Sequence, residues 1–219
     1  MNFKNQHSWD LTISEAKNLQ NELARKVIRN NDISKVSYVG GVDVGFDLKR
    51  NKTLAAVVIL SFPDLEIAES SLVIEDTRFP YIPGLLSFRE APSILKALER
   101  LNQIPDVILC DGQGIAHPRR LGIASHIGVI TGIPTIGVAK SRLIGQHDDV
   151  PNEKGQLVEL TDADEIIGAV LRTRKNVKPL YVSIGHKVDL INAIRIVLDC
   201  ITKYRLPETT RQAHKLASE

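Results

Sequence analysis

The chain has 219 residues, of which 43% are apolar and 25% are charged, a composition typical of a globular domain rather than of a disordered chain. No apolar run approaches the roughly 18 residues that a membrane-spanning helix needs, and the residues after Met1 lack the apolar core of a secretory signal. The two cysteines, Cys110 and Cys200, allow neither a disulfide framework nor a zinc site. We therefore expect one domain over residues 1–219, in a reducing, cytoplasmic compartment and without membrane contact.

The net charge of +2 hides an uneven distribution of charge along the chain. Residues 112–147 and residues 166–188 contain Lys and Arg but no Asp or Glu. Cations that are kept apart from acids are typical of a surface that faces a polyanion. Basic residues scattered over separate solvated faces would give the same pattern, so charge alone leaves both interpretations open.

The first half of the chain predicts a helix followed by three strands. Thr12 and Glu15 form a capping-box pattern, and apolar residues at helical spacing continue to about Arg29. Alternating and apolar runs predict strands at 35–46, 53–62 and 65–75, the last two paired as a hairpin through Pro63-Asp64. A Pro- and Gly-punctuated loop at 79–84 leads into a helix at 85–102, with Pro92 near its start or at a kink.

The second half alternates short strands with helices. Strands are predicted at 107–110, 134–139, 158–160, 166–173 and 180–184, and helices at 121–131, 189–202 and 207–218. This order predicts an α/β fold with a mixed central sheet flanked by helices, in which the short strands from Val107 onward are parallel. Ligand sites in such sheets lie at the carboxyl ends of the strands, and Asp43 and Asp111 stand at such positions.

Asp43 lies inside an apolar strand, where a lone carboxylate costs several kcal/mol unless it is paired or metal-bound. The glycines around it, Gly40, Gly41 and Gly45, predict a close approach of a ligand to the backbone. Asp111 directly follows a buried strand and precedes a Gly-x-Gly loop. A turn or capping role for either aspartate is the alternative.

The order of the acidic residues suggests a shared site. Asp43 on the first strand is followed by two further strands, then by Glu90 at the start of a helix, then by Asp111 at the end of the fourth strand. Alone, Glu90 fits an ordinary first-turn glutamate favoured by the helix dipole. Together, oxygen ligands from three elements suit Mg²⁺ or Mn²⁺ and the hydrolysis of a phosphodiester by an activated water.

Several long motifs then occur in one order along the chain. They are VGGVDV at 39–44, FPYIPGLLSFRE at 79–90, LCDGQGIAHPRR at 109–120, GIASHIG at 122–128, PTIGVAK at 134–140 and PETTRQAH at 207–214. In these motifs, over nearly its whole length, the chain resembles the endonuclease V family of deoxyinosine 3′-endonucleases. The resemblance implies a ribonuclease H-like fold and supplies inosine as the lesion, which the spacing of the acids does not.

The resemblance also implies roles for residues at the acidic site. Asp43 and Asp111 would ligate Mg²⁺, for which Mn²⁺ can substitute, and Glu90 would complete the acidic set. His214 would orient or deprotonate the attacking water; without the resemblance it would be an ordinary surface histidine. Lys140 would neutralise the phosphate or position water, and a solvated lysine at a strand end is its alternative.

Recognition of the lesion is implied for a second set of residues. Pro80, Tyr81, Ile82 and Pro83 would form a wedge that takes the place of the extruded base. The pocket for hypoxanthine would be largely lined by backbone, at Gly84, Leu86, Gly112, Gly122 and Ile123. His117, Arg119 and Arg120 would contact the DNA strand, although a structural hydrogen bond is an equally good interpretation of His117.

By resemblance the protein is a Mg²⁺-dependent DNA repair endonuclease. It would hydrolyse the second phosphodiester bond 3′ to deoxyinosine, leaving 3′-hydroxyl and 5′-phosphate ends. We expect a monomer without an obligate protein partner, acting on deoxyinosine-containing DNA or on inosine-containing RNA.

Several alternatives stay open from the sequence. The fold could serve an inosine-specific endoribonuclease, or a nucleic-acid-binding module that has no activity. Holliday-junction resolvases and ribonucleases acting on RNA–DNA hybrids use similar carboxylates. Asp43-Val-Gly45 also resembles the phosphate loop of actin-like and sugar-kinase phosphotransferases, but these usually need two such domains, and 219 residues are too few.

Overall fold

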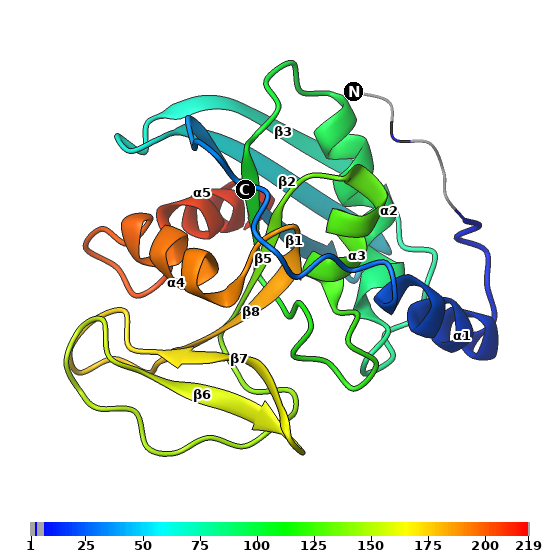
Figure 1. Ribbon diagram of the computed structural model, residues 1–219. Coiled ribbons are helices and arrows are strands. Elements are labelled where there is room, and N and C mark those ends of the chain that lie inside the picture. The colour runs from blue at the N-terminus through cyan, green and yellow to red at the C-terminus, as the bar shows by residue number, and fades with distance from the viewer. Residues whose placement is uncertain (1–2, 4–6, 219) are drawn as a thin grey trace.

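The computed structural model describes residue 3 and residues 7–218, which form one eight-stranded mixed sheet with helices on both faces (Figure 1). The strand order is β3-β2-β1-β4-β5-β8-β7-β6. The strands are β1 (Tyr38–Asp47), β2 (Lys52–Ser61), β3 (Ile67–Asp76), β4 (Val107–Cys110), β5 (Thr135–Ala139), β6 (Leu157–Asp162), β7 (Glu165–Leu171) and β8 (Leu180–His186). The helices are α1 (Ile13–Ala24), α2 (Leu86–Glu99), α3 (Ile123–Thr131), α4 (Leu190–Asp199) and α5 (Glu208–Ser218). Within the described part of the chain, none of the helices combines the length and apolarity needed to traverse a bilayer.

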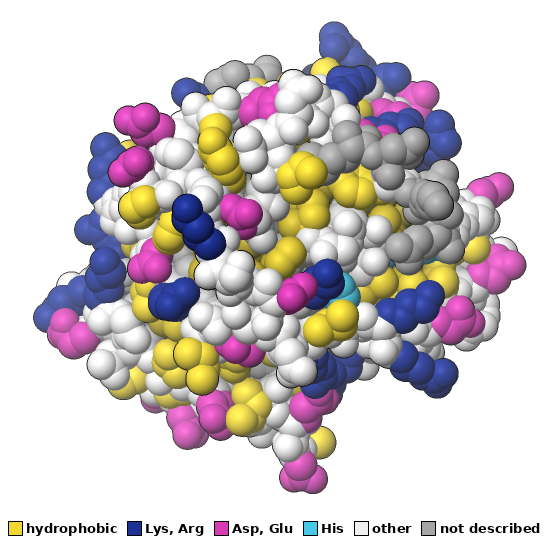
Figure 2. Space-filling view, turned by 45° about the horizontal axis from the view of Figure 1, so that its top comes forward, with side chains coloured by type: hydrophobic (Ala, Val, Ile, Leu, Met, Phe, Trp, Pro, Cys, Tyr) yellow, Lys and Arg dark blue, Asp and Glu magenta, His cyan; other side chains and the backbone are white. Residues whose placement is uncertain are grey.

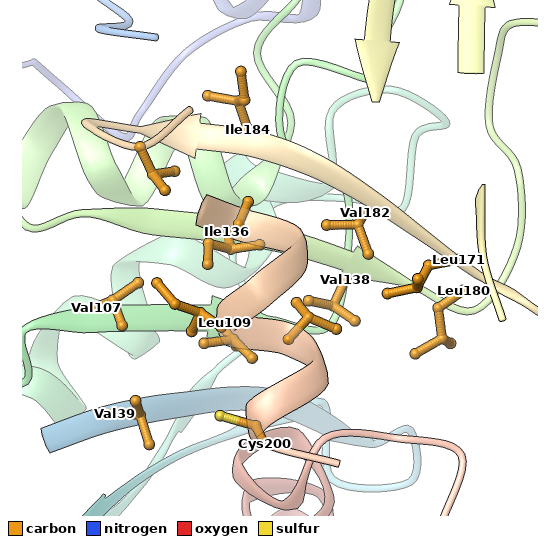
Figure 3. Packing of buried hydrophobic residues seen from close by; sticks show 14 of the residues in the cluster. Val39, Val107, Leu109, Ile136, Val138, Leu171, Leu180, Val182, Ile184 and Cys200 are labelled. Carbon is orange, nitrogen blue, oxygen red and sulfur yellow. The ribbon is translucent and has the colours of Figure 1, made fainter. Parts of the chain in front are cut away.

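The core consists of two apolar layers, one on each face of the sheet. Val107 and Leu109 of β4 face α4 and α5 (Figure 3), and they belong to one apolar cluster with Ala193 of α4 and Ala213 of α5. The alternate residues of the same strand, Ile108 and Cys110, face α2 and α3. Because both faces are covered, the central strands read as continuous apolar runs rather than as alternating ones.

The direction of the last strands differs from the sequence-based prediction. Strands β4 and β5 are parallel to β1 as expected, but β8 is antiparallel to β5, β7 is antiparallel to β8, and β6 is antiparallel to β7. The prediction that all short strands from Val107 onward are parallel is therefore wrong. The reason lies in the connections, because a parallel crossover needs a dozen or more residues, and only Ala163-Asp164 separates β6 from β7.

The ends of the helices depend on local hydrogen bonds. The capping box of α1 is confirmed, with Thr12 and Glu15 each bonding the backbone N–H of the other. Helix α1 ends at Ala24, five residues before the predicted Arg29. Pro92 lies inside α2 rather than at its start.

Glycines in β1 serve the packing of a helix and not, as predicted, the approach of a ligand. A Cβ atom on Gly41 would lie 2.2 Å from the Thr209 carbonyl oxygen of α5, and one on Gly45 would lie 2.7 Å from the Ala217 carbonyl oxygen. These two residues flank Asp43 on the same face of the strand, because side chains alternate. The close approach therefore brings α5 directly over the Asp43 carboxylate.

Candidate active site

Two carboxylates and a lysine meet where the parallel strands β4 and β5 end, beside the middle of β1. In the register of the sheet Val42 lies beside Cys110, and Cys110 lies beside Gly137. Asp43 and Asp111, the next residues along their strands, therefore come to the same edge, as the sequence predicts. Lys140 follows β5 directly, and its ammonium group donates to the Asp111 carboxylate.

His214 reaches this edge from α5. Its Nδ1 atom lies 2.7 Å from Asp43 Oδ2. The Asp43 side chain is 13% exposed, whereas that of His214 is 58% exposed. The contact holds the imidazole by one nitrogen and leaves the ring itself largely in solvent, where it can meet a substrate.

Glu90 approaches from the opposite layer, on α2. It is only 8% exposed. Burial, followed by the charges of Asp43 and Asp111, raises the pKa of Glu90 from its ordinary value of 4.5 to about 8. Burial also raises the pKa of Asp111, although its hydrogen bond with Lys140 acts in the opposite direction. The electrostatic coupling places Glu90 at the same acidic site as the two aspartates.

The acidic residues fit a divalent cation by their chemistry. Carboxylate oxygens are the ligands that Mg²⁺ prefers, and a positive charge would relieve the repulsion that raises the pKa of Glu90. Over residues 3 and 7–218, however, no three carboxylate, imidazole or thiol groups converge into a complete metal cage. The set therefore fits a site that takes part of its ligands from water and substrate, which is how Mg²⁺ is usually held.

A cavity of about 370 Å³ opens beside the acidic site. Asp111 and Lys140 line it, and so do Tyr81, Ile82 and Pro83. All residues predicted for the lesion pocket line it: Gly84, Leu86, Gly112, Gly122 and Ile123. The structure thus brings the predicted wedge, the predicted pocket and part of the acidic site into one concave surface.

The predicted wedge is a tight, exposed turn. Pro80 and Pro83 are exposed, and the Tyr81 side chain at the tip is 70% exposed. The N–H of Leu85 bonds the Ile82 carbonyl at 2.9 Å and closes the turn. An aromatic ring held in this way is available to a partner, since the domain itself does not bury it.

His117 and its two arginine neighbours are engaged within the protein rather than presented to a nucleic acid. His117 is 3% exposed, and its ring nitrogens contact the Gly84 carbonyl at 3.1 Å and the Arg119 N–H at 3.2 Å. Because Nδ1 accepts from Arg119, Nε2 carries the proton that is donated to Gly84. Burial and the Arg119 charge lower the pKa of His117 to about 4. Of the two interpretations of His117, the geometry favours the structural hydrogen bond.

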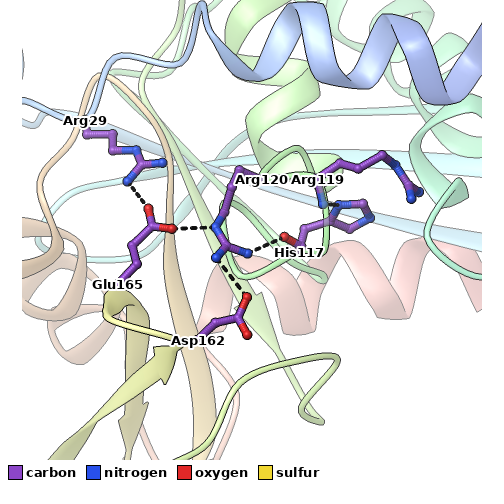
Figure 4. Close-up of polar contacts among 6 residues, drawn as sticks. All are labelled: Arg29, His117, Arg119, Arg120, Asp162 and Glu165. Atoms are coloured by element: carbon purple, nitrogen blue, oxygen red, sulfur yellow. Dashed lines mark hydrogen bonds and ion pairs between the residues drawn. The ribbon is translucent and has the colours of Figure 1, made fainter.

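Arg120 belongs to a network of ion pairs. It contacts Glu165 at 2.7 Å and Asp162 at 2.8 Å, and Glu165 in turn binds Arg29 (Figure 4). The Arg119 side chain points away from this network (Figure 4), and its Nη2 donates to the Gly84 carbonyl at 2.8 Å. On the face shown in Figure 2, basic side chains are interspersed with acidic ones and do not form a continuous block.

Sequence reasoning missed other residues that line the cavity. They are Gln20, Ser87, Gln113, Leu121, Ala139, Ser141, Arg142 and Leu143. Arg142 and Ser141 directly follow Lys140, so their proximity to that residue could have flagged them. Gln20 lies on α1, remote in sequence from every motif, and no signal in the sequence points to it.

The fold and the site define a class of protein: a nuclease of the ribonuclease H-like fold, with one aspartate directly after the central strand β4 and another inside the neighbouring parallel strand β1. The sequence profile of endonuclease V matches residues 21–215. The chain belongs to the endonuclease V family, as the resemblance in its motifs implied.

Individual relatives agree with this assignment over nearly their full lengths. Endonuclease V of Rippkaea orientalis is 59% identical over 218 residues, which are 100% of this chain and 95% of the relative. The crystal structure of endonuclease V from Streptomyces avermitilis is 43% identical, with a TM-score of 0.92 over 96% of this chain and 93% of that one. Ciona intestinalis endonuclease V, solved with a 23mer DNA containing an inosine followed by a ribo-adenosine, is 32% identical, with a TM-score of 0.84 over 94% and 95%.

Proposed function

We propose that this protein nicks DNA at deoxyinosine, by metal-dependent hydrolysis of the second phosphodiester bond 3′ to the lesion. The products would be 3′-hydroxyl and 5′-phosphate ends, and the reaction would begin the repair of deaminated adenine. The observation that carries the proposal is the single cavity that joins the exposed Tyr81 turn to Asp111 and Lys140. The Ciona relative bound to inosine-containing DNA supports the same substrate.

The wedge and the cavity have different roles in recognition of the lesion. Tyr81 enters the stack and fills the space of the extruded base, and the cavity receives hypoxanthine. Extrusion costs a few kcal/mol, and the cost is lowest for a mispaired base. Backbone N–H and C=O groups along the glycine-rich wall fit the O6 acceptor and N1–H donor of hypoxanthine, whereas adenine presents the opposite pattern.

Asp43 and Asp111 would hold Mg²⁺, or Mn²⁺ in its place, with Glu90 beside them. When bound, the cation supplies Lewis-acid stabilisation of the phosphate and of the leaving oxygen. His214, oriented by Asp43, takes the proton from the attacking water. Lys140 places a positive charge next to Asp111, where the phosphate charge develops.

The protein acts as a monomer, and residues 1–219 act as one domain, since one sheet runs from β3 to β6. Cys110 and Cys200 are buried free thiols, which suits a reducing cytoplasm.

A labelled duplex with one deoxyinosine tests the proposal, with Mg²⁺ or with EDTA, beside Asp43→Asn. We expect a nick that requires the metal and that Asp43→Asn abolishes. Asp64→Asn is the matched control, because Asp64 is an exposed aspartate in the β2–β3 turn. Binding without nicking under all conditions would indicate a non-catalytic nucleic-acid-binding module. The absence of both binding and nicking would refute the proposal.

Inosine in RNA is the second candidate substrate. The ribo-adenosine after the inosine in the Ciona complex favours it, because that relative accommodates a ribonucleotide on the 3′ side. The same assay with an inosine-containing RNA of equal sequence decides between the two. Faster cleavage of the RNA at saturating enzyme would assign the protein to RNA rather than to DNA repair.

A further inference from the structure

Gln20 is a buried amide that connects three distant segments beside the cavity. It is 1% exposed and lies on α1. Its Nε2 atom donates to the Gly84 carbonyl at 2.9 Å and to the Leu121 carbonyl at 3.2 Å. Its Oε1 atom accepts from Arg119 Nε. The two carbonyls need donors and the guanidinium needs an acceptor, so only one orientation of the amide satisfies all three contacts.

The carbonyl of Gly84 is the point at which this network meets the wedge. Besides the amide of Gln20 it accepts from Arg119 Nη2 at 2.8 Å and from His117 Nε2 at 3.1 Å. Gly84 has φ +78°, a conformation that side chains rarely adopt. Three donors on one carbonyl fix the plane of the peptide that joins the Tyr81 turn to helix α2.

We propose that Gln20 is a positioning residue for base recognition: with Arg119 and His117 it clamps the Gly84 carbonyl, and so sets the distance between the Tyr81 turn and the part of the cavity wall at Leu121. The inference rests on the proposed function, since it assigns the clamp to the pocket of the extruded base. It gives Arg119 a role in the shape of the pocket instead of a phosphate contact.

The arginine is suited to this clamp in a way that lysine is not. One planar guanidinium donates from Nε to Gln20 and from Nη2 to Gly84 at the same time. A lysine keeps the positive charge but has a single ammonium on a flexible stem, and so cannot reproduce the fork. Arg119→Lys therefore separates a geometric role from a purely electrostatic one.

The test compares Gln20→Met, Arg119→Lys and the double variant in steady-state nicking of deoxyinosine duplex. Gln20→Met nearly conserves side-chain volume and removes all three hydrogen bonds. We expect each single variant to raise KM about tenfold, with kcat within about twofold of the wild-type value. The KM of the double variant should rise no further than that of either single variant, because both substitutions break the same clamp. Asn21→Ala is the matched control, an exposed position on the same helix.

Hydrogen exchange supplies a readout that does not depend on activity. The amides within residues 80–86, which are those of Tyr81, Ile82, Gly84, Leu85 and Leu86 because the two prolines have none, should exchange faster in Gln20→Met and in Arg119→Lys than in the wild-type protein and in Asn21→Ala. If Gln20→Met does not fold, Arg119→Lys alone carries both measurements. If the wild-type protein does not nick inosine duplex, the proposed function fails, while the exchange of residues 80–86 still decides whether the clamp exists.

Two results would overturn the inference. One is that either single variant keeps the KM of the wild-type protein and its rates of amide exchange within residues 80–86. The other is a double variant whose losses of activity multiply, together with a smaller salt dependence of DNA binding in Arg119→Met, which removes the charge; that pair of results would make Arg119 a phosphate contact.

Discussion

Glu90 is an acid that binds its proton more tightly in the folded protein than in the unfolded chain, because burial and two nearby carboxylates disfavour its charge. Below pH 4.5 both states are protonated. Between pH 4.5 and pH 8 only the folded state keeps the proton, so stability falls by up to about 1.4 kcal/mol per pH unit as the pH rises. Above pH 8 the loss is complete. The site therefore costs stability at the pH where the reaction needs charged carboxylates.

Replacing Glu90 by Gln should remove this cost. In EDTA at pH 8 we expect Glu90→Gln to melt at a higher temperature than the wild-type protein, with the difference shrinking toward pH 5, while nicking with Mg²⁺ is lost. Thermal unfolding from pH 5 to pH 9 measures the effect, and Glu22→Gln, on the exposed face of α1, is the control. Parallel melting curves for Glu90→Gln and wild type across this range would contradict the assignment.

Arg120 and Arg142 are both arginines near the cavity, but their surroundings predict different functions. Arg120→Ala breaks the ion pairs to Asp162 and Glu165 and should lower stability by about 1 kcal/mol, with no change in the salt dependence of DNA binding. Arg142 is exposed on the cavity rim, so Arg142→Ala should leave stability unchanged and reduce the salt slope by about one. Melting temperatures and binding titrations at several salt concentrations measure both. A smaller salt slope with unchanged stability in Arg120→Ala would show instead that Arg120 binds a phosphate.

At the scale of elements, the packing of α5 on β1 joins His214 to Asp43. A methyl group on Gly41 would collide with the α5 backbone, whereas one on Gly40 would meet the flexible ring of Pro105 at 3.2 Å. Gly41→Ala should cost about 1–3 kcal/mol and lower nicking more than tenfold by displacing His214. Gly40→Ala, the neighbouring control, should cause a smaller loss of stability and a smaller loss of nicking. Urea unfolding and single-turnover nicking compare them, and equal activities would show that the position of α5 does not matter.

The elements show where sequence reasoning succeeds and where it stops. Strand β4 was predicted at its observed bounds, because a short apolar run between Pro105-Asp106 and a Gly-rich loop allows little else. The capping box of α1 was predicted because its partners are three residues apart. Gln20 was not, since its carbonyl partners lie 64 and 101 residues away in the chain.

The acidic site was predictable from the sequence only up to a point. The rule about strand ends brought out Asp43 and Asp111, while His214 needed the family resemblance because a histidine on a terminal helix carries no signal of its own. The antiparallel course of β6 to β8 was missed because strand periodicity does not encode direction. The lengths of the connections between the strands encode direction, and the short connection between β6 and β7 can be seen in the sequence.

For the whole molecule, buried histidines oppose Glu90 in the dependence of stability on pH. Burial lowers the pKa of His126 to about 3, and that of His117 and His186 to about 4. As the pH falls below the ordinary value of 6.5, the unfolded chain binds protons at these residues that the folded protein does not. Stability therefore falls on the acid side of pH 6.5, where three histidines outweigh one glutamate, and on the alkaline side, where Glu90 dominates.

In EDTA we therefore expect the free energy of unfolding to pass through a maximum near pH 7. Urea unfolding at pH 5.5, 7 and 8.5 tests this. His186→Gln should reduce the fall in the free energy of unfolding from pH 7 to pH 5.5 and leave the fall from pH 7 to pH 8.5 unchanged. A free energy that rises steadily from pH 5.5 to pH 8.5 would show that Glu90 is not held as a neutral acid.

The proposed function requires one continuous site that recognises inosine and cuts the strand at a fixed distance from it. Its most direct test is the mapping of the cut, at single-nucleotide resolution, in a duplex labelled at either end and carrying one deoxyinosine, beside the same duplex with adenine. We expect, with Mg²⁺, a single nick between the first and second nucleotides 3′ to the inosine, with 3′-hydroxyl and 5′-phosphate ends, and no nick in the adenine duplex. Cuts scattered along the strand, or equal cutting of both duplexes, would contradict the account.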